Sequence, residues 1–108
     1  MEDLRKDQRI RFGFRVEDAA AKTTWMAEDI SAGGCFLQAV KKAPVGANIS
    51  LVFQLPGSAK YIEAVGEVRH IEEKGMGIEF VTMDADSKEE TARFVGDYLK
   101  YQDQPPKD

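Results

Sequence analysis

The chain has 108 residues, of which 43% are hydrophobic and 31% charged, so it is large enough for one domain with a single modest core. Its formal net charge of -4 argues against a protein that coats DNA or RNA, and no apolar run approaches the roughly 18 residues that a membrane span needs. The single cysteine, Cys35, excludes an internal disulfide and a metal site built from several cysteines. The polar start at residues 1–5 does not resemble a signal peptide, so we expect a cytoplasmic protein without membrane insertion.

The charges are unevenly distributed along the chain. Residues 1–15 hold five basic and three acidic side chains, whereas the rest of the chain holds ten basic and sixteen acidic ones. A basic start on an acidic body suits a local anion site better than a broad nucleic-acid surface, although a solvated, charged arm would have the same composition. We therefore expect no nucleic-acid polymer as a partner.

Apolar and polar residues alternate along most of the chain, which predicts β-strands. The first strand, residues 10–16, alternates with arginines, and the second, residues 23–30, ends at Gly33-Gly34, a pair that permits positive φ and close backbone approach. Four further strands are predicted at 35–40, 48–55, 61–71 and 76–80, with turns at 44–46, 56–57 and 74–75 and a candidate bulge at Gly66.

The pattern changes to helical spacing near the carboxyl end. Ser87 followed by Glu90 is typical of a capping box and predicts a helix start there. About six strands and one helix predict an all-β fold, a small antiparallel Greek-key-like β-barrel with one C-terminal α-helix. We expect three parts: a flexible segment at 1–9, the barrel with its helix at 10–101, and a disordered tail at 102–108.

Two motifs carry the functional interpretation. The first is Arg5-Lys6-Asp7-Gln8-Arg9, with two arginines four residues apart just ahead of the first strand. The second is Asp29-Ile30-Ser31-Ala32-Gly33-Gly34, at the end of the second strand. An RxxxR segment followed by DxSxxG resembles the PilZ domain family. The likeness continues through Pro44-Val45-Gly46, Gly66-Glu67-Val68-Arg69 and residues 75–80, and so spans roughly residues 4–100.

The resemblance implies a receptor domain for the second messenger cyclic di-GMP that has no catalytic activity and needs no cofactor. Its implied ligand-binding residues are Arg5, Arg9, Asp29, Ser31 and Gly34. Their chemistry suits this ligand, because a guanidinium can bind a phosphate bidentately and can also meet guanine O6 and N7. A carboxylate can accept hydrogen bonds from guanine N–H groups, a hydroxyl can donate or accept, and glycine lets the backbone approach the ligand.

Four other positions are auxiliary candidates: Leu4, Lys6, Gly33 and Arg69. Some family members present a residue toward the ligand at the position of Arg69. In the family, the position of Leu4 influences whether one ligand or an intercalated pair is bound. Leucine offers no surface for guanine stacking, so we expect one cyclic di-GMP per domain.

Without ligand we expect residues 1–9 to be flexible, and we expect the ligand to order them on the barrel and so alter the surface offered to an unidentified downstream protein. Family members act in motility and biofilm regulation. Three other functions stay open: a protein–protein adaptor that binds no nucleotide, a barrel that binds single-stranded nucleic acid, and an enzyme. The intact motifs disfavour the first, the acidic body the second, and the lack of a nucleophile–base pair the third.

Three further residues have structural interpretations. His70 is the chain's only histidine and has no second histidine or cysteine to form a metal site, so we expect a surface or rim residue. We expect Cys35 to be a small packed residue and Trp25 to belong to the core or its rim.

Overall fold

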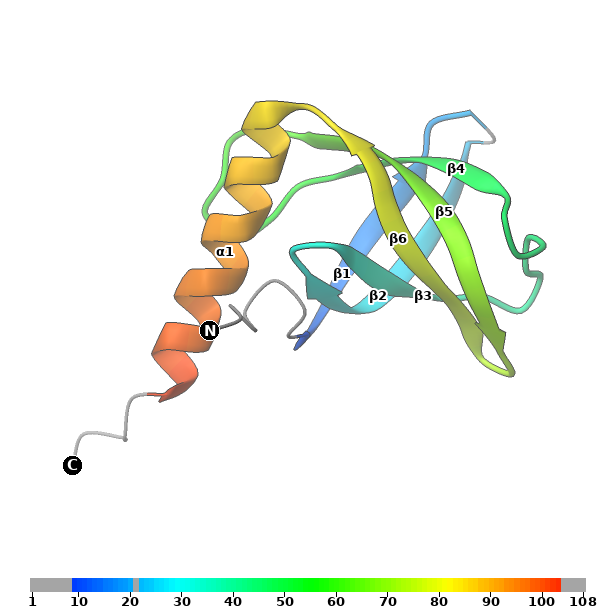
Figure 1. Ribbon diagram of the computed structural model, residues 1–108, viewed down its shortest axis with the longest axis horizontal. Coiled ribbons are helices and arrows are strands. Elements are labelled where there is room, and N and C mark those ends of the chain that lie inside the picture. The colour runs from blue at the N-terminus through cyan, green and yellow to red at the C-terminus, as the bar shows by residue number, and fades with distance from the viewer. Residues whose placement is uncertain (1–8, 21, 104–108) are drawn as a thin grey trace.

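The segments that alternate in sequence all form strands in the computed structural model, which describes residues 9–20 and 22–103, the last three as backbone only (Figure 1). The elements in chain order are β1 (Ile10–Asp18), β2 (Thr23–Ser31), β3 (Gly34–Gln38), β4 (Asn48–Phe53), β5 (Ile62–Glu72), β6 (Gly75–Met83) and α1 (Ala85–Asp103). The helix continues to Asp103, two residues beyond the expected boundary at 101, and residues 104–108 of the expected tail lie outside the described part.

The six strands pair antiparallel into a closed barrel in the order β1-β2-β3-β6-β5-β4. Strands β4, β5 and β6 are neighbours in sequence and in space, whereas β3 lies beside β6, which is the Greek-key connection. Closure between β1 and β4 leaves no long unpaired edge among the described strands, and a chain of this size would have difficulty covering such an edge. The predicted fold class is confirmed.

The apolar side chains of the alternating pattern point inward and fill the barrel interior. Val16, Leu37, Leu51 and Phe53 are at most 2% exposed, and Trp25 packs against this core as expected. Cys35 is fully buried beside them. Desolvation raises the pKa of its thiol to about 12, with Asp29 adding to the shift and Arg9 opposing it. Cys35 is therefore a core residue without thiolate character at neutral pH.

The helix starts two residues before the position predicted from the capping box. Asp84 caps it, since its Oδ1 accepts a hydrogen bond from the Ser87 backbone N–H at 2.7 Å. Ser87 is therefore inside the first turn, where its carbonyl oxygen accepts from the Thr91 hydroxyl at 2.8 Å. The prediction of a start at Ser87 was wrong because an aspartate three residues earlier supplies the same capping chemistry.

The helix α1 lies at one end of the barrel and contacts β1, β2 and β5 (Figure 1). Thr91 and Val95 are almost completely buried on its inner face. Phe12 of β1 packs against Phe94 and Tyr98, with ring centroids 5.3 and 6.2 Å apart. Among the described residues no helix is both long enough and apolar enough to cross a membrane.

The predicted turns at 44–46 and 56–57 are confirmed, and Gly46 and Gly57 supply their positive φ angles of 93° and 80°. Gly33 and Gly34 lie at the β2–β3 turn as expected, but neither has a positive φ. A bulge was expected at Gly66 on β5, but the extra residue is on the neighbouring strand. Val65 pairs with Thr82 and Gly66 with Phe80, so Val81 of β6 has no partner position.

Candidate functional site

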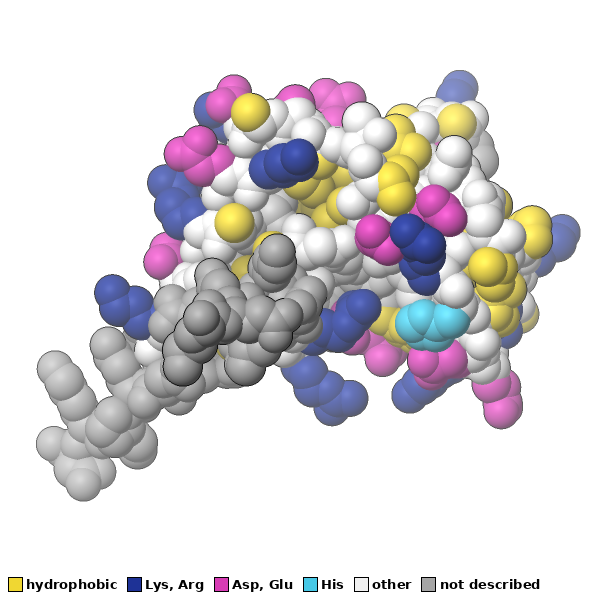
Figure 2. Space-filling view, viewed as in Figure 1, with side chains coloured by type: hydrophobic (Ala, Val, Ile, Leu, Met, Phe, Trp, Pro, Cys, Tyr) yellow, Lys and Arg dark blue, Asp and Glu magenta, His cyan; other side chains and the backbone are white. Residues whose placement is uncertain are grey.

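A hollow of about 350 Å³ opens on the outer surface of the barrel where four segments meet. These are the residue before β1, the β2–β3 turn, the bulged part of β5 and the middle of β6. The lining residues are Arg9, Ser31, Gly33, Gly34, Arg69, His70, Gly77, Ile78 and Glu79. Figure 2 shows the corresponding face, where the chain's single histidine, in cyan, lies among basic and acidic side chains. Arg9, the last residue of the arginine motif, therefore meets the second motif at one place in the fold.

The first polar group of the site is the ion pair between Arg9 and Asp29. Arg9 Nη1 donates to Asp29 Oδ1 at 2.8 Å, and the same oxygen accepts from the Phe36 backbone N–H at 3.1 Å. A register shift in β2 makes Glu28 an extra residue between Ala27 and Asp29, and this turns Asp29 away from the core toward Phe36. Asp29 thus fixes an arginine that keeps 43% of its side chain exposed.

The second part of the site is the tight turn between β2 and β3. The Ser31 hydroxyl donates to the Gly34 carbonyl oxygen and accepts from the Gly33 N–H, both at 3.3 Å. The Gly33 carbonyl oxygen accepts from the Phe80 N–H at 2.8 Å, which binds the turn to β6. A Cβ on Gly34 would collide with the Ile78 carbonyl oxygen, so glycine is required there by the approach of two strands.

The third part of the site comes from β5 and β6, where the sequence predicted only Arg69. Glu79 Oε1 accepts from Arg69 Nε at 2.7 Å, and Glu67 lies 3.8 Å from Arg69 Nη1. The His70 Nε2 lies 3.1 Å from Glu72, and its ring covers Gly77, where any side chain would clash with it. His70 is exposed, as expected of a rim histidine, but it lines the hollow, a role that its isolated position in the sequence does not signal.

The predicted residues that the structure describes lie together. Arg9, Ser31, Gly34 and the auxiliary Gly33 and Arg69 line the hollow, and Asp29 is bonded to Arg9. The other predicted residues are Leu4, Arg5 and Lys6, which lie outside the described residues.

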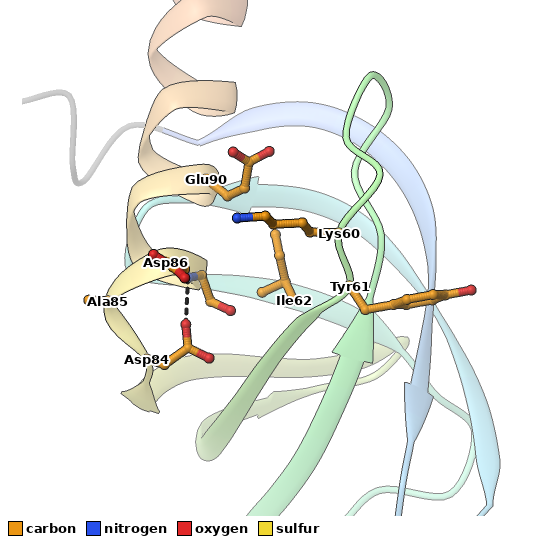
Figure 3. A pocket seen from close by; sticks show the side chains of 8 residues that line it. Lys60, Tyr61, Ile62, Asp84, Ala85, Asp86 and Glu90 are labelled. Carbon is orange, nitrogen blue, oxygen red and sulfur yellow. Dashed lines mark hydrogen bonds between the residues drawn. The ribbon is translucent and has the colours of Figure 1, made fainter.

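A second hollow, of about 480 Å³, lies between the β4–β5 loop and the start of α1 (Figure 3). Asp84, Asp86 and Glu90 line it with one cation, Lys60, and the Tyr61 ring points away from it. The dashed line in Figure 3 is the helix cap from Asp84. The excess of carboxylates in this hollow disfavours an anionic ligand. None of the motif residues that the structure describes lines it.

Comparison with known proteins assigns a family to most of the chain. The family model for the PilZ domain matches residues 3–97. The chain belongs to the PilZ domain family. No curated protein matches it.

Among solved structures, this PilZ domain is similar to the Bacillus subtilis inhibitor of motility, MotI/DgrA, with a TM-score of 0.77 and 18% sequence identity. The likeness covers 89% of this chain and 51% of that one, so the chain spans about half the length of that structure. At this identity the likeness establishes the shared fold alone.

PilZ domains are generally cyclic di-GMP receptors and are not enzymes. The hollow of this PilZ domain has two guanidinium groups, a hydroxyl and the two glycines of the β2–β3 turn in its lining. Three carboxylates, those of Asp29, Glu67 and Glu79, lie beside the guanidinium groups. Guanidinium groups suit phosphate oxygens and the Hoogsteen edge of guanine, and carboxylates suit its N–H donors. These groups are therefore chemically suited to polar contacts with a guanine nucleotide.

Proposed function

We propose that this PilZ domain is a cyclic di-GMP receptor that binds its ligand in the hollow between Arg9 and Arg69. The observation that carries the proposal is the 2.8 Å hydrogen bond from Arg9, the last residue of the arginine motif, to Asp29, the first residue of the DxSxxG motif. In this proposal Arg9 contacts a phosphate or guanine, and Asp29 accepts from guanine N–H groups. Ser31, Gly33 and Gly34 form the floor beneath the ligand.

The exposure of the Arg9–Asp29 ion pair supports this assignment. Arg9 and Asp29 have side-chain exposures of 43% and 20%, so both are reachable from solvent. Exposed ion pairs contribute only about 0–1 kcal/mol, so a ligand can replace this one at little cost. Three or four charge-assisted hydrogen bonds of about 1.5–3 kcal/mol each, less the cost of ordering, fit an affinity on the order of micromolar or tighter.

The output of the domain is proposed to be a change in protein contacts. Arg5 belongs to the same motif as Arg9 and precedes it by four residues. Binding would draw the segment that carries Arg5 onto the ligand and change the surface beside β1 and the β2–β3 turn. A downstream protein would recognise that changed surface. The segment lies outside the described residues, so this step rests on the motif.

Isothermal titration calorimetry of the wild-type chain with cyclic di-GMP tests the proposal, with cyclic di-AMP and GTP as controls. We expect saturable binding of cyclic di-GMP with a stoichiometry near one, because Leu4 offers no stacking surface to a second ligand. Adenine lacks the O6 acceptor and the N1–H donor, so cyclic di-AMP should bind at least tenfold more weakly. No heat with cyclic di-GMP at about 100 times the expected micromolar dissociation constant would contradict the proposal and favour an adaptor that binds no nucleotide.

A further inference from the structure

A β-bulge aims Arg69 at the nucleotide site. Val68 pairs with Ile78 and His70 pairs with Gly77, so Arg69 is an extra residue on β5 with no partner position on β6. A bulge of this kind re-aims the side chains beside it. Arg69 and His70 are accordingly both exposed, although they are consecutive in a strand whose earlier residues alternate. The bulge therefore places the guanidinium of Arg69 at the hollow.

The two carboxylates beside Arg69, those of Glu67 and Glu79, lie close enough to repel each other. Glu67 and Glu79 occupy directly paired positions of β5 and β6. Like charges at paired positions destabilise a sheet. Arg69 offsets this repulsion through its contacts of 2.7 Å to Glu79 and 3.8 Å to Glu67. These are half-exposed ion pairs, which stabilise a fold very little, so folding alone gives little reason for two glutamates at this place.

The described part of the site holds more carboxylates than guanidinium groups. Arg9 is matched by Asp29, and Arg69 is matched by Glu79 with Glu67 in excess. Glu79 itself lines the hollow, so its charge faces any bound ligand. A terminal phosphate carries about -1.5 to -2 at pH 7, whereas each diester phosphate of a cyclic dinucleotide carries one charge. Repulsion by Glu79 therefore acts more strongly on a nucleotide with a terminal phosphate.

We propose that Glu79 is a specificity-determining residue of this site, which rests on the function proposed above. It holds Arg69 in place and, together with Glu67, disfavours linear and mononucleotide ligands that carry terminal phosphates. A cyclic dinucleotide, whose phosphates are both diesters, is tolerated. Such rejection of a competitor by like charge is a common source of specificity.

The test compares the affinities of cyclic di-GMP and the linear dinucleotide pGpG for wild type and Glu79→Gln by calorimetry. Glutamine keeps an oxygen that can accept from Arg69 Nε but removes the charge. We expect the affinity for pGpG to rise about tenfold and that for cyclic di-GMP by no more than about threefold. The gain for pGpG should shrink as salt is raised, because the contact is exposed. Glu63→Gln is the matched control, since it removes the same charge from the far end of β5 and should change neither affinity.

An equal change for both ligands in Glu79→Gln, or weaker pGpG binding, would overturn this inference and leave the receptor function in place. If the wild-type chain binds no cyclic di-GMP, the receptor function and this inference fail together. Thermal unfolding of each variant shows that it is folded before its affinity is interpreted.

Discussion

Replacing Arg9 with alanine should weaken cyclic di-GMP binding by about 2 kcal/mol or more, roughly 30-fold, and leave the fold intact. The guanidinium is the group that the structure holds at the edge of the hollow through Asp29. Its removal takes away charge-assisted bonds to the ligand and leaves the carboxylate of Asp29 unopposed beside a ligand that is itself negatively charged. Calorimetry measures the loss of affinity, and urea unfolding should show a stability change below about 1 kcal/mol.

Arg15→Ala is the matched control for this variant. Arg15 is an exposed arginine on β1 that does not line the hollow, and its removal lowers the net charge by the same amount. We expect its affinity for cyclic di-GMP to stay within about twofold of wild type, because long-range charge effects are screened at physiological salt. Equal losses in the two variants would mean that Arg9 acts only through net charge, which contradicts the site proposed here.

Replacing Gly34 with alanine should destabilise the protein by about 2–4 kcal/mol and also abolish the site. Gly34 pairs with Ser31 on one side and with Glu79 on the other, in the part of the barrel where β3 joins β6. An added Cβ would meet the Ile78 carbonyl oxygen and, at 3.3 Å, the Glu79 Cα. Both are backbone atoms, so the strands themselves must move apart. Urea unfolding at constant m-value measures the loss of stability.

Gly96→Ala is the control for the glycine substitution. Gly96 lies within α1, and among the described residues a Cβ there would meet no atom within 4 Å apart from its own stretch of helix. Alanine should therefore stabilise the protein by up to about 1 kcal/mol through its higher helix propensity. A Gly34→Ala protein as stable as wild type would show that β3 and β6 are not packed as closely as the structure has them.

The fold was largely predictable because the barrel interior accepts only one side of each strand. This constraint produces the alternation of apolar and polar residues in the sequence. The buried positions are Ile10, Phe14 and Val16 in β1 and Ile49, Leu51 and Phe53 in β4. The helix start was missed by two residues because Asp84 and Ser87 both have side chains that can cap a helix. Only the backbone geometry distinguishes which of them does so.

The candidate site was predictable only in part. The motifs gave Arg9, Asp29 and Ser31, and the structure brings them together. Glu79 and His70 had no such signal, because their position depends on the pairing of β6 with both β3 and β5 and on the bulge at Arg69. A single extra residue in a strand reverses which face the next side chain occupies, and nothing in the local sequence around Arg69 specifies it.

The most direct test of the central claim is an NMR titration of the ¹⁵N-labelled chain with cyclic di-GMP. We expect the largest chemical-shift changes at the backbone amides of Arg9, of the β2–β3 turn at Ser31–Gly34, and of Arg69, His70 and Gly77–Glu79. These residues come from four segments of the chain, and together they line the proposed site. Changes centred instead on residues 60–62 and 84–90, the acidic hollow of Figure 3, or no changes at saturating ligand, would contradict the proposed receptor site.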